Sequence, residues 1–272
     1  MNLALVPSDL DYLAHLERDS ARFVEVLQRT PSGTQVPTCP DWDADDLIWH
    51  LAEVQWFWGT IAREKVTETE RANELDHPDR PDNRAGLVTF YDQASRDLGK
   101  ALASAPPETP AWTWSEDQSV GFIRRRQAHE ALIHRIDAEL TAGERTDMDP
   151  ALSLDGVDEV LRVMYGGAPP WGQFTPANES TVRVRTTDTG DSWLLTLGQF
   201  VGIDPDDGSA VDEPDLRVAA TDSGGPAAAE LTGSAADLDC WLWHRPTVGE
   251  VEPTGDSDVL ASFTATIAPG IS

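Results

Sequence analysis

The segment from Gln127 to Leu140, QAHEALIHRIDAEL, combines side chains that could bind a metal ion. Glu130, His134 and Asp137 follow one another at spacings of four and three residues. On an α-helix each residue turns by about 100°, so these spacings place all three side chains on one face. A carboxylate and an imidazole at i and i+4 can bind one metal ion from a single helix. On spacing alone, an acidic surface helix with an incidental histidine is the commoner explanation.

His50 makes a metal site a stronger explanation, because it lies in a second segment whose pattern predicts a helix with one apolar side. That side carries Leu47, Leu51, Val54, Phe57, Trp58 and Ile61. A lone histidine on such a face is most often a core residue bonded to a backbone carbonyl. In a helical bundle, however, inward residues of different helices meet, and metal sites are built in this way. His50, Glu130 and His134 would supply two nitrogens and one oxygen, a set that suits zinc and leaves one position for water or substrate.

Asp137 has two possible roles in this arrangement. One turn beyond His134, its carboxylate could accept a hydrogen bond from an imidazole and so orient that ring towards a metal ion. Alternatively, it forms a surface ion pair with Arg135 or with an arginine of the run at 124–126.

The elements that must position these residues are helices in the first half of the chain. Apolar residues at helical spacing predict four of them. We expect Ser8 to cap the first, which ends near Gln28, and Asp43 to cap the second. The four predicted helices are 8–28, 44–65, 84–104 and 120–142. Their similar lengths and modest connections predict an antiparallel four-helix bundle.

The pattern changes between residues 145 and 155. A fifth helix is predicted at 157–165, followed by alternating runs typical of strands and by a helix that Ser234 would cap. We therefore expect a helical domain at 1–148 and a smaller α+β domain at 149–272.

Composition excludes several classes of partner. The 272-residue chain has 20 basic and 48 acidic residues, a formal charge of −28, which would repel nucleic acids and anionic membranes.

Cys39 and Cys240 form no disulfide framework or metal motif, and Cys39 is expected to be a packed, structural thiol. Without a signal peptide or membrane-spanning run, the expected location is the cytoplasm, as a monomer or homodimer.

Three segments resemble the mycothiol-dependent maleylpyruvate isomerase family. They are VPTCPDWDADDLIWHLAEV, RRRQAHEALIHRIDAEL and LTGSAADLDCWLWHRP, which occur in the family's order across nearly the whole chain. The resemblance implies a DinB-like four-helix bundle followed by a sterol-carrier-like α+β domain. It implies a divalent metal, usually Zn²⁺, at His50, Glu130 and His134, with mycothiol as thiol cosubstrate. It also suggests that Arg245 binds an anionic substrate, and the alternative role for this arginine is a structural ion pair with a carboxylate.

The leading hypothesis is therefore a metal-dependent thiol enzyme, either an S-transferase or a cis–trans isomerase, that acts on a small electrophile. Trp112 and Trp114 could line the cleft of such an enzyme. The commoner role for tryptophans at such positions is to fill the end of a helical bundle. Two alternatives stay open on the sequence. The protein could be a non-catalytic metal- or thiol-responsive protein, or a small-molecule-binding module centred on residues 150–272.

Overall fold

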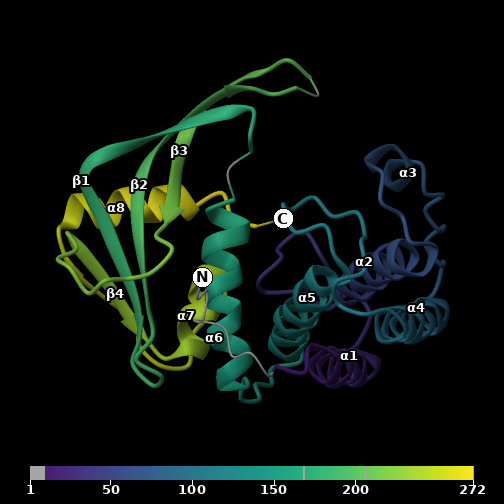
Figure 1. The fold of residues 1–272 in the computed structure, drawn as a ribbon. Helices are drawn as coiled ribbons and strands as arrows, with labels where there is room; N and C mark the ends of the chain where they lie inside the picture. The colour runs from purple at the N-terminus through teal and green to yellow at the C-terminus, as the bar shows by residue number, and fades with distance from the viewer. Residues whose placement is uncertain (1–9, 168, 206, 272) are drawn as a thin grey trace. The chain divides into compact units, whose positions relative to one another are not determined.

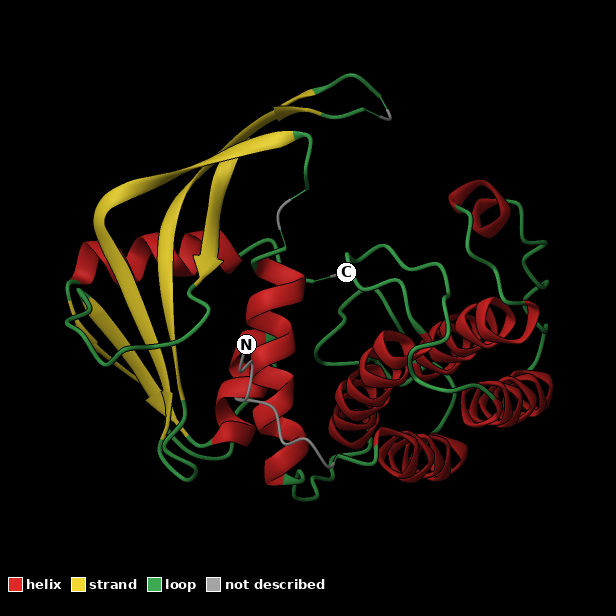
Figure 2. Ribbon diagram, viewed as in Figure 1, coloured by secondary structure: helices red, strands yellow, loops and turns green. Residues whose placement is uncertain are grey.

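The computed structural model describes residues 10–167, 169–205 and 207–271. Contacts divide the chain into two compact units, a helical unit at Asp11–Asp147 and a second unit that contains Met148–Ser272. Figure 1 labels the elements of each unit, and Figure 2 shows that strands occur only in the second. The expected combination of a helical part with an α+β part is confirmed. Within the described residues, no helix combines the length and apolar character needed to cross a bilayer.

The helical unit contains the four predicted long helices and one short helix. They are α1 (Tyr12–Arg29), α2 (Ala44–Glu64), α3 (Thr69–Asn73), α4 (Arg84–Ser104) and α5 (Val120–Thr141). Helix α2 packs on α4 and on α5, and α1 packs on α5. The short helix α3 was not predicted, since its polar residues show no apolar periodicity. Ser8 lies outside the described residues, and the observed cap of α1 is Asp11.

The start of α2 is fixed by local hydrogen bonds, and this matters because α2 carries His50. The Asp43 carboxylate accepts hydrogen bonds from the backbone amides of Asp45 and Asp46, and the Asp46 carboxylate accepts one from the Asp43 amide. This reciprocal capping box satisfies amides that would otherwise lack partners at the helix start. The predicted cap at Asp43 is confirmed.

The second unit is built on a five-stranded sheet of order β3-β2-β1-β4-β5. The strands are β1 (Gly172–Thr186), β2 (Ser192–Ile203), β3 (Ala210–Val218), β4 (Ala229–Gly233) and β5 (Glu252–Gly255). Strands β1 and β4 are parallel, and the other pairs are antiparallel. The helices are α6 (Pro150–Glu159), which continues as a π-helical turn over Val160–Tyr165, α7 (Ala235–Leu242) and α8 (Ser257–Ile267). Helix α8 packs on the sheet, and α6 packs on α7.

Three features of this unit differ from the sequence-based expectation. The helix predicted at 157–165 begins earlier, at Pro150, with Asp149 as its cap. The sequence reads there as a linker, but proline is well tolerated in the first helical turn. Strand β5 and helix α8 were not predicted. The predicted cap at Ser234 is confirmed.

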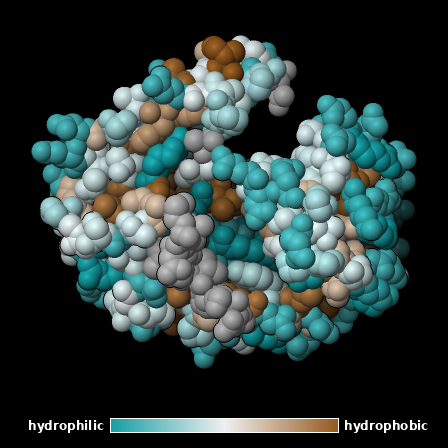
Figure 3. Space-filling view, in the orientation of Figure 1, coloured by the Kyte–Doolittle hydropathy of each residue, from teal (hydrophilic) through white to brown (hydrophobic). Residues whose placement is uncertain are grey.

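The β2–β3 ribbon extends beyond the rest of the sheet (Figure 1). Apolar side chains gather near its tip in Figure 3, and two residues of β2, Val201 and Ile203, are exposed. The core of the unit lies at the other end of the strands, where Val182, Val184 and Leu195 are fully buried.

Candidate metal centre

Three side chains from two helices meet in the helical unit. Nε2 of His50, on α2, lies 3.1 Å from Nε2 of His134, on α5. Oε1 of Glu130 lies 3.1 Å from the same His134 nitrogen and 3.5 Å from Nε2 of His50. Within the described residues, this is the one group of three or more histidine, cysteine or carboxylate side chains close enough to share a metal ion.

Each helix positions its ligands by its own geometry. Glu130 and His134 are one helical turn apart on α5, so their side chains lie one above the other. His50 reaches them because α2 packs against α5. The site is partly open, since the side chain of His50 is 30% exposed. The sequence predicted that the apolar side of α2 around His50 would be fully buried. In the structure, Val54 and Phe57 on this side of α2 are only half-buried, like His50 itself.

His134 is oriented from behind by a buried carboxylate. Its Nδ1 lies 3.0 Å from Oδ2 of Asp137, which is fully buried. Oδ1 of Asp137 accepts a 2.6 Å hydrogen bond from the hydroxyl of Thr38. A carboxylate only accepts, so Nδ1 of His134 carries a proton and the lone pair of the neutral ring lies on Nε2. The alternative role for Asp137, a surface ion pair, is wrong because the side chain is not at the surface.

Glu130 is held in place by an arginine. Arg126, one turn earlier on α5 and almost completely buried, donates from Nη2 to Oε2 of Glu130 over 2.9 Å. This ion pair leaves Oε1 directed at the two histidines. Burial alone would raise the pKa of Glu130, but hydrogen bonds with His134 and His50 and the charge of Arg126 hold it well below its usual value.

The cluster favours positive charge at its centre. Burial alone would lower the pKa of His134, but hydrogen bonds with Asp137 and Glu130 raise it to about 9. With Nδ1 protonated, a neutral His134 would direct its Nε2 lone pair at the lone pairs of the Glu130 carboxylate. A proton or a metal cation between these atoms removes that repulsion.

The separations of the three atoms fit a tetrahedral ion. For metal–ligand bonds of about 2.0–2.1 Å, neighbouring ligands of tetrahedral zinc lie about 3.3 Å apart. The observed separations of 3.1, 3.1 and 3.5 Å lie on either side of this value. Two imidazoles and one carboxylate are also a donor set that catalytic zinc sites use. The residues present therefore fit a divalent cation with one position left for another ligand.

An aromatic ring covers one side of His50. The centroids of the Trp42 and His50 rings are 4.6 Å apart. Trp42 is held by the turn before α2, where its amide donates to the Cys39 carbonyl and its carbonyl accepts from the Val36 amide. Cys39 packs against the core of the unit, in keeping with the structural role expected for it.

Sequence reasoning missed three residues of this site. Arg126 precedes Glu130 by four residues, so the helical spacing that linked Glu130 to His134 could have found it. Thr38 and Trp42 lie in the turn before α2, within a segment that resembles the family, but no helical periodicity applies there and their contacts with the site were not predicted.

The other predicted residues lie elsewhere. Arg245 follows α7 in the second unit and donates from Nη1 to the carbonyl of Trp243, so its substrate-binding role stays a prediction. Trp112 stacks on Trp58 and donates from its indole nitrogen to Thr69, which favours a packing role. The Trp114 side chain is 48% exposed and contacts Phe122 edge-on.

Comparisons with known proteins cover nearly the whole chain. Residues 13–139 match the family model of the mycothiol maleylpyruvate isomerase N-terminal domain, and residues 151–262 match that of the MDMPI C-terminal domain. The crystal structure of the mycothiol-dependent maleylpyruvate isomerase is similar at 12% identity, with a TM-score of 0.54 over 93% of this chain and 95% of that one. A histidine-to-alanine mutant of that enzyme is similar at 11% identity, with a TM-score of 0.55 and the same coverage. At such identities the likeness shows a shared fold. A comparison with curated protein sequences gives no match.

Proposed function

Because the chain belongs to the mycothiol-dependent maleylpyruvate isomerase family, we propose that it is an enzyme that uses mycothiol to attack a small electrophile. The reaction is either an S-transfer or a cis–trans isomerisation of the maleylpyruvate type. The observation that carries the proposal is the convergence of His50, Glu130 and His134 on one point of the helical unit.

These three side chains would hold one divalent cation, and the two nitrogens favour Zn²⁺. A zinc ion there would lower the pKa of a thiol ligand, so that the thiolate predominates at neutral pH. The protein's own residues prepare this position. Asp137 keeps the His134 lone pair on Nε2, and Arg126 keeps one oxygen of Glu130 turned away from the centre. The partial exposure of the His50 side chain supports access of a thiol from solvent.

Both candidate reactions begin with the formation of a carbon–sulfur bond. The sulfur of the mycothiol thiolate adds to one carbon of a double bond conjugated to a carbonyl, and the electron pair moves onto the carbonyl oxygen. The former double bond can then rotate. In an isomerase, the electron pair returns, the C–S bond breaks and the thiolate is released with the trans product. In an S-transferase, the adduct takes up a proton and keeps the sulfur.

Residues 1–148 would form a DinB-like antiparallel four-helix bundle, and residues 149–272 a sterol-carrier-like domain. We expect a cytoplasmic monomer or homodimer that binds neither nucleic acid nor membrane. The excess of carboxylates supports the last point, because polyanions would be repelled.

The direct test is incubation of the zinc-loaded protein with mycothiol and either maleylpyruvate or a general alkylating electrophile. The products are followed by NMR and mass spectrometry. Trans product with mycothiol recovered indicates an isomerase, and a stable sulfur adduct indicates an S-transferase. We expect one of these products only when mycothiol is present. Stoichiometric metal binding without turnover of either electrophile would instead support a non-catalytic metal- or thiol-responsive protein.

Arg245 gives a narrower prediction. If its guanidinium binds an anionic substrate, Arg245→Gln should raise KM for a carboxylate-bearing electrophile by about 10- to 100-fold and leave KM for an uncharged one unchanged, because a charge-assisted hydrogen bond contributes about 1.5–3 kcal/mol. Steady-state kinetics with the two electrophiles makes the comparison. An equal loss with both electrophiles would assign Arg245 to folding, where its bond to the Trp243 carbonyl would be its main role.

A further inference from the structure

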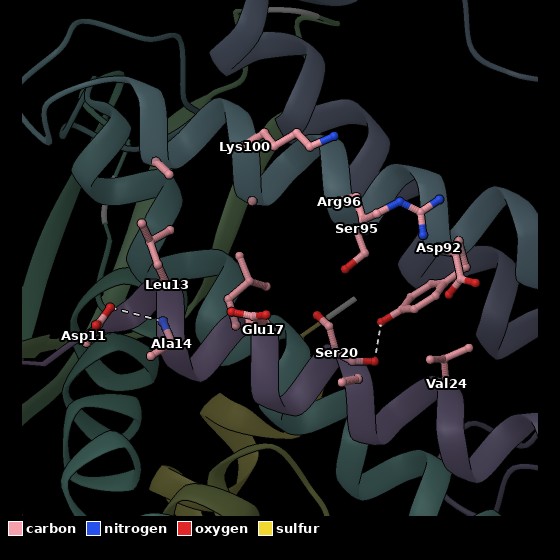
Figure 4. A pocket seen from close by; sticks show the side chains of 15 residues that line it. Asp11, Leu13, Ala14, Glu17, Ser20, Val24, Asp92, Ser95, Arg96 and Lys100 are labelled. Carbon is pink, nitrogen blue, oxygen red and sulfur yellow. Dashed lines mark hydrogen bonds between the residues drawn. The ribbon is translucent and has the colours of Figure 1, made fainter.

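A cavity of about 730 Å³ opens between α1 and α4 of the helical unit (Figure 4). Its volume falls within the range of about 300–1,000 Å³ that is typical of small-molecule sites. The lining residues belong to α1 and α4 or directly precede α1, whereas the three clustered side chains belong to α2 and α5. The cavity is therefore a different feature from the candidate metal centre.

One end of the cavity is closed by helix packing. The hydroxyl of Tyr91, on α4, donates to the backbone carbonyl of Ser20, on α1, over 2.9 Å. The ring of Tyr91 also lies 5.2 Å from that of Phe23, measured between centroids. The apolar side chains of Leu13, Leu16 and Val24 add to the lining on the α1 side.

Gly99 keeps the α4 wall open. A glycine inside a helix costs about 0.5–1 kcal/mol relative to alanine, so its presence calls for a reason. At Gly59 the reason is packing, because a Cβ there would lie 3.2 Å from the backbone of Leu98. At Gly99, apart from its chain neighbours and the nearby backbone of its own helix, no atom lies within 4 Å of the position a Cβ would take. Packing does not require this glycine, and its effect is to widen the cavity that it lines.

The α4 wall also carries two cations. Arg96 and Lys100 are one turn apart and both line the cavity (Figure 4). The chain has 48 acidic and 20 basic residues. Most of its arginines form ion pairs with carboxylates. Within the part of the chain that the structure describes, neither Arg96 nor Lys100 forms an ion pair, and Arg96 donates only to Gln93. The lining also holds three carboxylates: Asp92 lies one turn before Arg96 on α4, and Asp11 and Glu17 lie on the α1 side, where Glu17 faces the two cations across the cavity (Figure 4).

We propose that this cavity binds an amphipathic carboxylate, with its alkyl or aromatic body over the apolar lining and its carboxylate beside Arg96 and Lys100. Apolar lining with a few convergent charges is the usual construction of a small-molecule site. Arg96 and Lys100 favour a carboxylate head because they are adjacent on α4 and form no ion pair within the described residues, so one ligand carboxylate can bind both. The three carboxylates of the lining are instead spread over both walls, with Asp92 on α4 and Asp11 and Glu17 on the α1 side.

Isothermal titration of decanoate into the zinc-loaded, full-length protein tests the proposal. We expect saturable binding of one equivalent below about 1 mM, which corresponds to roughly 4 kcal/mol. Gly99→Leu should abolish it by filling the cavity, whereas Gly99→Ala, which adds one methyl group to open space, should retain most of it. Neither change should lower the melting temperature, because both replace a helical glycine.

Removing the positive charges and removing the negative charge of Glu17 should change decanoate affinity in opposite directions. The double variant Arg96→Gln/Lys100→Gln should weaken decanoate binding by about 4- to 25-fold, two- to fivefold for each exposed charge. Glu17→Gln should strengthen it by up to about fivefold. The idea is overturned if decanoate does not bind, if Gly99→Leu leaves its binding intact, or if the charge changes act in the reverse direction. Tighter binding of decylamine than of decanoate would likewise reject a carboxylate ligand.

Discussion

Replacing His134 with alanine is expected to remove the bound metal and, with it, the thiol-dependent reaction. His134 is the central member of the cluster, because its Nε2 lies 3.1 Å from both His50 Nε2 and Glu130 Oε1. Four-ligand zinc sites bind with about 10–16 kcal/mol, or about 2.5–4 kcal/mol for each ligand. Loss of one ligand should therefore weaken zinc binding by about 10²- to 10³-fold. Elemental analysis after dialysis and a competitive chelator titration measure the loss.

His77→Ala is the matched control for this variant. His77 is an exposed histidine of the same unit, paired with Glu53 at 3.0 Å, and it is not part of the cluster. We expect it to keep both the metal and the activity. Removal of zinc from the unmodified protein with a chelator should reproduce the loss seen in His134→Ala, and added zinc should restore only the unmodified protein. Full activity in a His134→Ala protein that contains no metal would refute the proposed role of the cluster.

The long helices were predictable because their signals are local. Helix α4 has the bounds expected from the sequence, and α5 ends one residue before the expected position. Each begins at a side chain that caps its own first turn, since Asn83 accepts from the Gly86 amide and Ser119 from the Phe122 amide. Such bonds join residues three apart and depend little on the rest of the fold.

The candidate site was only partly predictable from the sequence, because it depends on contacts between residues that are far apart in the chain. The spacing of Glu130 and His134 on one helix is visible in the sequence, but their distance from His50 depends on how α2 and α5 pack. Thr38 joins Asp137 across 99 positions of sequence, from a turn that has no helical periodicity. The pairing of such residues carries no periodic signal. This explains why the ligands were proposed from the sequence and their supporting partners were found only in the structure.

Substitutions at Asp137 and Thr38 are expected to weaken metal binding, because these two residues are hydrogen-bonded to each other behind His134. Asp137→Asn keeps the size of the side chain but removes the negative charge that stabilises a proton on His134 Nδ1. Partners that hydrogen-bond to metal-bound histidines typically change metal affinity by about 10- to 100-fold, so we expect a loss of that size. Thr38→Val removes only the 2.6 Å hydrogen bond to Asp137 and should cost about three- to tenfold, as expected for one hydrogen bond of about 1 kcal/mol.

Thr38→Ser separates this positioning role from simple packing. Serine keeps the hydroxyl and loses a methyl group, whereas valine keeps the shape and loses the hydroxyl. If Thr38 acts through Asp137 on His134, zinc affinity should be close to normal in Thr38→Ser and reduced in Thr38→Val, with similar melting temperatures of the metal-free proteins. If both variants lose affinity equally, or if only Thr38→Ser loses it, the methyl group is what matters and Thr38 serves only to pack the turn. Because His134 Nε2 can coordinate a cation only while the proton stays on Nδ1, the order of these affinities reports directly whether the buried hydrogen bonds hold that proton in place.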